Sequence, residues 1–117
     1  MNDRDLSLLK IVLKFSRELE ENIAKHNLDY DKFVSDKMYT NSIAMSVFQV
    51  AEYVGKVSNE TKIKYSNIRW RPISGLRNRI AHGYDGIDFE YIWLAATESI
   101  LELKIQLEKI LDEFAEK

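Results

Sequence analysis

Apolar residues recur at three- and four-residue steps along much of the chain, the spacing that places them on one face of an α-helix. Over residues 5–26 the stripe comprises Leu8, Val12, Phe15, Leu19 and Ile23. Over residues 41–58 it comprises Ile43, Val47, Val50, Val54 and Val57, widened by Ala44, Phe48 and Ala51. Both stretches predict amphipathic helices. The wider apolar face of the second predicts that it is the more buried.

A third stripe runs through the C-terminal part of the chain. It comprises Phe89, Trp93, Ala96, Ile100, Leu103, Leu107, Ile110 and Phe114. This regular alternation of four and three is typical of a helix that packs along the seam of a bundle, and Asp88 stands where it can cap the first turn.

Shorter segments separate these stripes. Residues 29–36 predict a connector with at most a short helical turn, capped by Asp29 or Asp31. Residues 70–82 predict another helix, because Pro72 is tolerated in a first turn and Gly83 can end the helix in a left-handed conformation. The loop "GYDGID" follows.

Length and composition fit one folded domain. The 117 residues suffice for one hydrophobic core, and 45% hydrophobic with 31% charged residues is an ordinary globular balance. We therefore expect residues 1–117 to form a single all-α domain, a bundle of four to five helices. The absence of cysteine excludes disulfides and thiolate metal sites. A charged N-terminus and no apolar run of about 20 residues predict a cytoplasmic protein without a membrane span.

Positive charge is concentrated in one segment, although the net charge of the chain is −2. Residues 62–84 contain no acidic residue and six basic ones: Lys62, Lys64, Arg69, Arg71, Arg77 and Arg79. Such a segment in an otherwise acidic chain points to a phosphate-bearing partner, although a solvated basic face is an equally good interpretation.

This segment ends in "RNRIAHGY", residues 77–84, which holds one of the two histidines. Asn78 and His82 are four apart and share a helix face, and the long side chain of Arg77 can reach the same point. Histidine can transfer protons near neutral pH, and arginine can hold a phosphate with two hydrogen bonds. Helix-end chemistry offers another explanation, because the helix dipole favours basic residues before a terminal glycine.

The stretch resembles the motif of the minimal HepT-like toxins of the HEPN superfamily: arginine, four residues, histidine, one residue, tyrosine. Arg77, Asn78, His82 and Tyr84 fill its positions, and the flanking "IRWRPISGLRNR" and "YDGIDFEYIW" fit as well. The resemblance implies an endoribonuclease toxin of a type VII-like toxin–antitoxin pair that cleaves RNA without a metal or other cofactor.

The resemblance also implies how the site is assembled and controlled. The toxin would be a homodimer with its active site where two motif helices meet. His82 would be the acid or base, Arg77 the phosphate holder and Asn78 the orienting partner. A minimal nucleotidyltransferase antitoxin would adenylylate Tyr84, adding bulk and negative charge beside the site.

Other residues are weaker candidates for a role in function. Lys64, Arg69, Arg71 and Arg79 are candidate RNA contacts, and Tyr65 and Trp70 could stack on bases or belong to the core. Glu52 could pair with Arg77 or lie at the surface. His26 suits a helix end. No metal site is expected, because the two histidines and the scattered carboxylates lack close ligand spacing.

A second function fits the same residues. A non-catalytic helical subunit could bind a substrate and present it to a nucleotidyltransferase. Both functions predict a dimer with the same partner, and they differ in whether His82 is needed for RNA cleavage.

Overall fold

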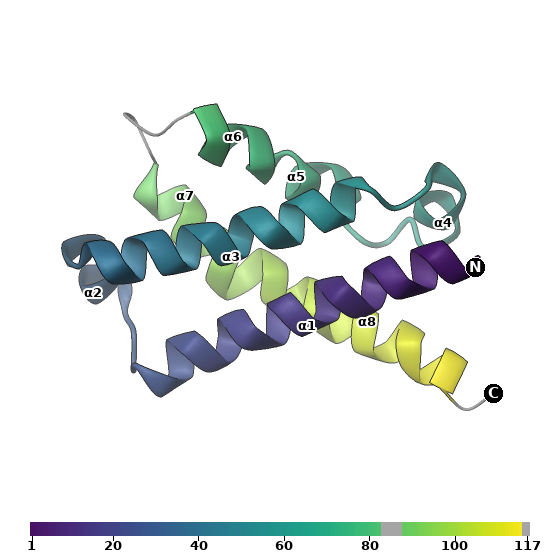
Figure 1. The fold of residues 1–117 in the computed structure, drawn as a ribbon, viewed down its shortest axis with the longest axis horizontal. Helices are drawn as coiled ribbons and strands as arrows, with labels where there is room; N and C mark the ends of the chain where they lie inside the picture. The colour runs from purple at the N-terminus through teal and green to yellow at the C-terminus, as the bar shows by residue number, and fades with distance from the viewer. Residues whose placement is uncertain (83–87, 116–117) are drawn as a thin grey trace.

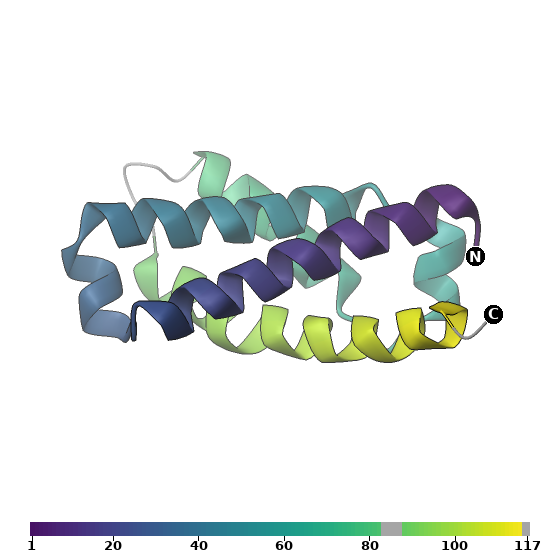
Figure 2. The same cartoon turned by 60° about the horizontal axis from the view of Figure 1, so that its bottom comes forward.

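Three long helices form the body of the protein (Figure 1). The computed structural model describes residues 1–82 and 88–115, and every regular element in these ranges is helical. The long helices are α1 (Asp3–Lys25), α3 (Lys37–Gly55) and α8 (Ile100–Ala115). Helix α1 runs antiparallel to both α3 and α8 (Figure 2). The predicted all-α fold is confirmed.

Shorter elements close the ends of the bundle and cover α3. They are α2 (Tyr30–Ser35), α4 (Asn59–Lys64), α5 (Trp70–Ser74), α6 (Leu76–His82), α7 (Phe89–Leu94) and the π-helical turn η1 (Ala95–Ser99). Helices α2 and α4 lie at opposite ends, and α5 and α6 pack along α3 (Figure 1).

The core contains the predicted stripes of α3 and of the C-terminal helix. On α1 the buried face differs from the prediction: Leu9 and Leu13 are buried with Val12 and Leu19, whereas Leu8, Phe15 and Ile23 are only partly buried. From α3 and the residues that follow it, the buried side chains are Ile43, Ala44, Val47, Val50, Ala51, Val54 and Val57. From the C-terminal stripe they are Ala96, Ile100, Leu103, Leu107 and Ile110, with Phe89, Trp93 and Phe114 partly buried against them. Burial of these side chains is the main force that holds the helices together. Within the described ranges, no helix is both long and apolar enough to cross a lipid bilayer.

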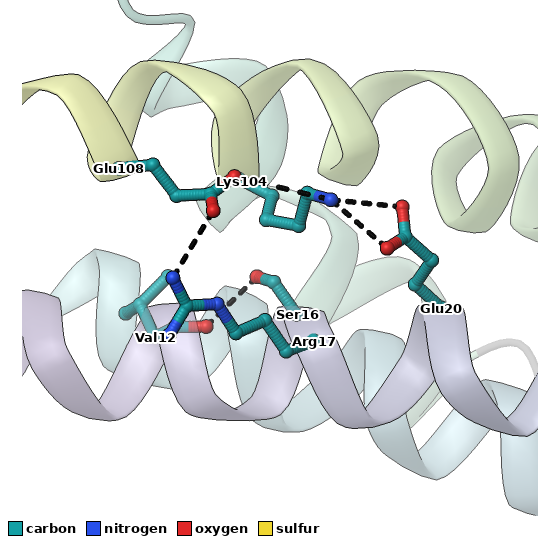
Figure 3. A network of polar contacts seen from close by, with 6 residues as sticks. All are labelled: Val12, Ser16, Arg17, Glu20, Lys104 and Glu108. Atoms are coloured by element: carbon teal, nitrogen blue, oxygen red, sulfur yellow. Dashed lines mark hydrogen bonds and ion pairs between the residues drawn. The ribbon is translucent and has the colours of Figure 1, made fainter.

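Charged side chains of α1 and α8 form ion pairs at the surface between the two helices (Figure 3). Arg17 Nη2 lies 3.1 Å from Glu108 Oε2, and Lys104 Nζ lies 2.9 Å from Glu20 Oε1. Lys104 Nζ also lies 3.9 Å from Glu108 Oε1, so the four charges form one network. Exposed ion pairs contribute little stability singly, but a network fixes the register of the two helices.

Several helix boundaries differ from the prediction because short caps define them. Asn2 accepts a hydrogen bond from the Asp5 amide at 2.7 Å, so α1 begins at Asp3 rather than at Asp5. Asp36 accepts from the Met38 amide at 2.9 Å, so α3 begins at Lys37. The predicted turn at residues 29–36 is confirmed as α2, with Asp29 as its cap.

Two predicted helices are divided, and one helix was not predicted. The predicted helix 41–58 ends at Gly55, because Ser58 caps the short helix α4. The predicted helix 70–82 is two helices, α5 and α6, with Gly75 between them. The predicted helix 89–114 contains the π-helical turn η1, in which one extra residue is accommodated and both Ala95 and Ala96 are buried.

Candidate active site

Helix α6 carries three exposed polar residues on the side that faces away from the core. Leu76 and Ile80 are 3% and 6% exposed, so they anchor the helix to the core, and Arg77, Asn78 and Arg79 are exposed. The preceding helix α5 is anchored by the buried Trp70 and Ile73. Packing therefore fixes the backbone that presents the predicted site residues.

Arg77 is held by α3. Its Nε atom forms an ion pair with Glu52 Oε2, an oxygen that is itself shielded from solvent. The guanidinium carbon lies 5.9 Å from the ring centre of Phe48, one turn before Glu52 on the same face of α3. Of the two positions considered for Glu52 from the sequence, paired with Arg77 or at the surface, the structure shows the ion pair with Arg77.

Asn78 lies beside this guanidinium. Nη1 of Arg77 is 3.4 Å from Asn78 Oδ1, a long and weak hydrogen bond. A guanidinium has five N–H donors. Glu52 contacts the Nε edge, so N–H donors of the two terminal nitrogens are left over for a phosphate oxygen.

Arg79, a predicted RNA contact, lies against α7. Its guanidinium carbon lies 4.0 Å from the ring centre of Tyr91 on α7, within the range of a cation–π interaction. Arg79 thus links α6 to α7 across the 83–87 connection. No role at the site is predicted for Tyr91 or Phe48 from the sequence, although the spacing of Phe48 and Glu52 indicates a shared helix face.

His82 is the last residue of α6 and lies four positions after Asn78. Its side chain lies outside the part of the chain that the structure describes. Tyr84, the predicted adenylylation site, also lies outside the described residues. The assignments of His82 and Tyr84 therefore remain predictions from the sequence.

The other predicted RNA contacts lie away from α6. Lys64 is on α4, Arg71 is on α5, and Arg69 immediately precedes α5. Trp70 belongs to the core, as its 6% exposure shows, and its indole N–H donates to the Tyr65 carbonyl at 3.0 Å. The exposed His26 caps the end of α1, in agreement with its predicted helix-end role.

No metal-binding cluster is found among the described side chains. Groups of three or more histidine, cysteine, aspartate or glutamate side chains that could hold an ion are absent from this part of the molecule. The charged residues of α6 whose side chains the structure describes are the paired Arg77 and the stacked Arg79. This surface suits an anionic ligand that is held by N–H donors.

Comparison with known proteins identifies similar sequences. The family described as Ribonuclease HepT-like matches residues 10–110. "Putative RNase MJ0125" of Methanocaldococcus jannaschii is 26% identical over 112 residues, covering 96% of this chain and 89% of the relative. "Putative RNase TTE0752" of Caldanaerobacter subterraneus is 30% identical over 84 residues, covering 72% and 75%. "Probable ribonuclease HepT" of Thermococcus cleftensis is 24% identical over 102 residues, covering 87% and 84%. No solved structure gave a significant match.

Proposed function

Because the chain belongs to the Ribonuclease HepT-like family, we propose that it is a metal-independent endoribonuclease whose active site lies on α6. One observation supports this location above all: the Glu52 ion pair orients Arg77 next to Asn78, on the helix whose last residue is His82. A cation held in advance can stabilise the charge that develops on a phosphate during cleavage without reorganising at that moment.

In the proposed reaction the ribose 2′-oxygen attacks the adjacent phosphorus. His82 removes the 2′-hydroxyl proton, and His82 of the partner subunit gives a proton to the departing 5′-oxygen. The products are a 2′,3′-cyclic phosphate and a 5′-hydroxyl end. Arg77 binds the non-bridging oxygens through its terminal nitrogens, and Asn78 orients the substrate or the histidine.

The proposal extends to assembly and control. A homodimer with a two-fold axis beside α6 would supply the two histidines that this reaction uses. The protein would act as a toxin, and a minimal nucleotidyltransferase antitoxin would silence it. The Tyr84 oxygen would attack the α-phosphorus of ATP and release pyrophosphate, and the bound AMP would add negative charge beside the cations.

Cleavage of RNA by purified wild-type protein and by His82→Ala tests the catalytic part. The matched control is His26→Ala, which removes the other histidine from an exposed helix end. We expect His82→Ala to lose about 10²-fold or more in rate, the usual scale for a general acid–base group, and His26→Ala to cut normally. Cyclic phosphate ends and activity in EDTA are also expected. Unchanged cleavage by His82→Ala would contradict the mechanism and favour the non-catalytic substrate-binding subunit.

Intact-mass spectrometry tests the proposed regulation by adenylylation of Tyr84. After incubation with the nucleotidyltransferase and ATP, wild type and Tyr91→Phe should gain the mass of AMP, and Tyr84→Phe should not. Tyr84→Phe should still cut RNA, because it keeps the ring. Modification that persists in Tyr84→Phe would move the acceptor to another residue.

A further inference from the structure

A groove of about 630 Å³ lies between α4 and α5, apart from the candidate active site. Lys62 and Ile63 line it on the α4 side, and Arg69 and Arg71 line it on the α5 side. Trp70 also lines it, and the hydrogen bond from its indole to the Tyr65 carbonyl ties down the connection between the two helices. The walls of the groove are therefore fixed by the fold.

The groove is positively charged. Three of its nine lining residues, Lys62, Arg69 and Arg71, are basic, and none of the nine is acidic. Among the residues that the structure describes, none of the three forms an ion pair, in contrast to Arg77. Neighbouring cations repel one another, so a polyanion in the groove would relieve this repulsion.

Arg69 borders a second cavity as well as the groove. The second cavity has a volume of about 310 Å³ and contains Glu98 and Glu102. These carboxylates reduce the positive potential there. The groove side, where Lys62 and Arg71 lie, is therefore the favoured position for a phosphate near Arg69.

The groove and the candidate active site lie on consecutive helices, since α5 borders the groove and α6 carries the site. Gly75 has helical dihedral angles (φ −66°, ψ −19°), and its amide donates to the Arg71 carbonyl at 3.0 Å, so the chain passes from α5 into α6 with little change of course. Arg71 and Asn78 are seven residues apart, which is two helical turns and about 10 Å. Figure 1 shows α4, α5 and α6 in succession along one side of the molecule.

We propose that this groove binds the backbone of a single RNA strand beyond the bond that is cut at α6. This inference rests on the proposed function. The cations along the groove would contact successive phosphates, and Ile63, which is 76% exposed, offers an apolar surface for an unstacked base. Because phosphate contacts carry no sequence information, the groove lengthens the bound strand without selecting its bases.

Fluorescence anisotropy with a labelled 2′-O-methyl oligoribonucleotide tests this inference. The probe lacks the attacking hydroxyl, so its binding is independent of cleavage. The test variant is Lys62→Gln/Arg69→Gln/Arg71→Gln. The control, Lys10→Gln/Lys14→Gln/Lys25→Gln, removes three exposed lysines from α1 and changes the net charge equally. Far-UV circular dichroism checks that both variants are folded. If the triple groove variant does not fold, the single variant Arg71→Gln replaces it as the test variant.

We expect the groove variant to bind roughly tenfold more weakly at about 0.1 M salt, and the control to match wild type. The slope of log K against log salt should fall by about 2, since each lost phosphate contact on a single strand accounts for about 0.7. Equal affinities for groove variant and control would overturn the inference. The inference would also be overturned if the groove variant bound RNA with unchanged affinity but bound a partner protein more weakly. RNA that binds the groove but is never cut would contradict only the proposed function.

Discussion

At the scale of single residues, the pairing of Arg77 with Glu52 changes what a substitution of Arg77 should do. Glu52 Oε2 is shielded from solvent, so Arg77→Ala leaves a carboxylate oxygen without its cation. Loss of a partner from a buried acceptor costs about 1–3 kcal/mol, and the partial exposure of both side chains places this case near 1 kcal/mol. Urea unfolding should show this loss, and the double variant Arg77→Ala/Glu52→Gln should recover part of it. No recovery would mean that the ion pair does not contribute to stability.

Glu52 should also act on catalysis, as a positioning residue for Arg77. Glu52→Ala removes the group that holds the Nε edge, so we expect kcat for RNA cleavage to fall by roughly tenfold, in line with a misoriented transition-state contact. Glu52→Gln keeps an oxygen at the same place and should restore most of kcat. Steady-state kinetics of the two variants distinguish the roles. A Glu52→Gln protein as impaired as Glu52→Ala would assign the effect to the negative charge rather than to geometry.

The sequence identified the site residues by resemblance and left their partners open. Arg77, Asn78 and His82 occupy motif positions, and their order along one helix follows from spacing alone. The contact of Arg79 with Tyr91 depends on where α7 lies relative to α6, and the Arg77–Glu52 pair depends on how α6 packs on α3. Tertiary contacts of this kind have no local signature.

At the scale of the elements, the long helices and the short helix α2 were predictable, whereas α4, the division of residues 70–82 and the π-helical turn were not. The three- and four-residue steps identified the apolar faces of α1, α3 and α8 because these faces repeat over many turns. Helix α4 has six residues and a buried Thr61 rather than an apolar stripe, so it leaves no periodic signal. The π-helical turn was missed because an alternation of four and three fits an undisturbed helix equally well.

Asp5 connects two of these elements and predicts an acid-sensitive contact. Its buried carboxylate accepts hydrogen bonds from the Ser58 amide at 3.2 Å, the Ser58 hydroxyl and the Thr61 hydroxyl at 2.6 Å, which joins α1 to the start of α4. Burial alone raises the pKa of Asp5, but the hydrogen bonds from Ser58 and Thr61 and the nearby Arg4 outweigh burial, so the pKa lies below its ordinary value. The ionised form is therefore favoured in the folded protein.

The sign of the pH dependence follows from this lowered pKa. The contribution of Asp5 to the free energy of unfolding is fully present above the unfolded pKa of about 4 and is lost as pH falls through the lower folded pKa. Urea unfolding of wild type and Asp5→Asn between pH 7 and pH 2 should show a difference that shrinks below about pH 4. Comparison with Asp3→Asn, at an exposed position in the same turn, separates this effect from general titration of carboxylates. A difference in the free energy of unfolding that stays constant down to pH 2 would show that it does not depend on ionisation of Asp5.

At the scale of the whole molecule, the proposed reaction needs two proton-transfer groups, and α6 provides one histidine per chain. We therefore expect a homodimer, and the surface beside α6 suits the contact: Tyr91 and Leu94 of α7 are 36% and 51% exposed, and both line a cavity with the α6 residue Leu76. Covering such apolar area in a symmetric contact stabilises the dimer.

Light scattering should give twice the chain mass of 13.7 kDa at micromolar concentration. Leu94→Glu should shift the mass toward the monomer, because a charge placed at the centre of a self-complementary contact is buried twice, once in each copy. Ile105→Glu, a similarly exposed position on α8, should leave the mass unchanged. RNA cleavage should decline with the dimer fraction of Leu94→Glu. A fully active monomer would show that one His82 is sufficient and would remove the need for a shared site.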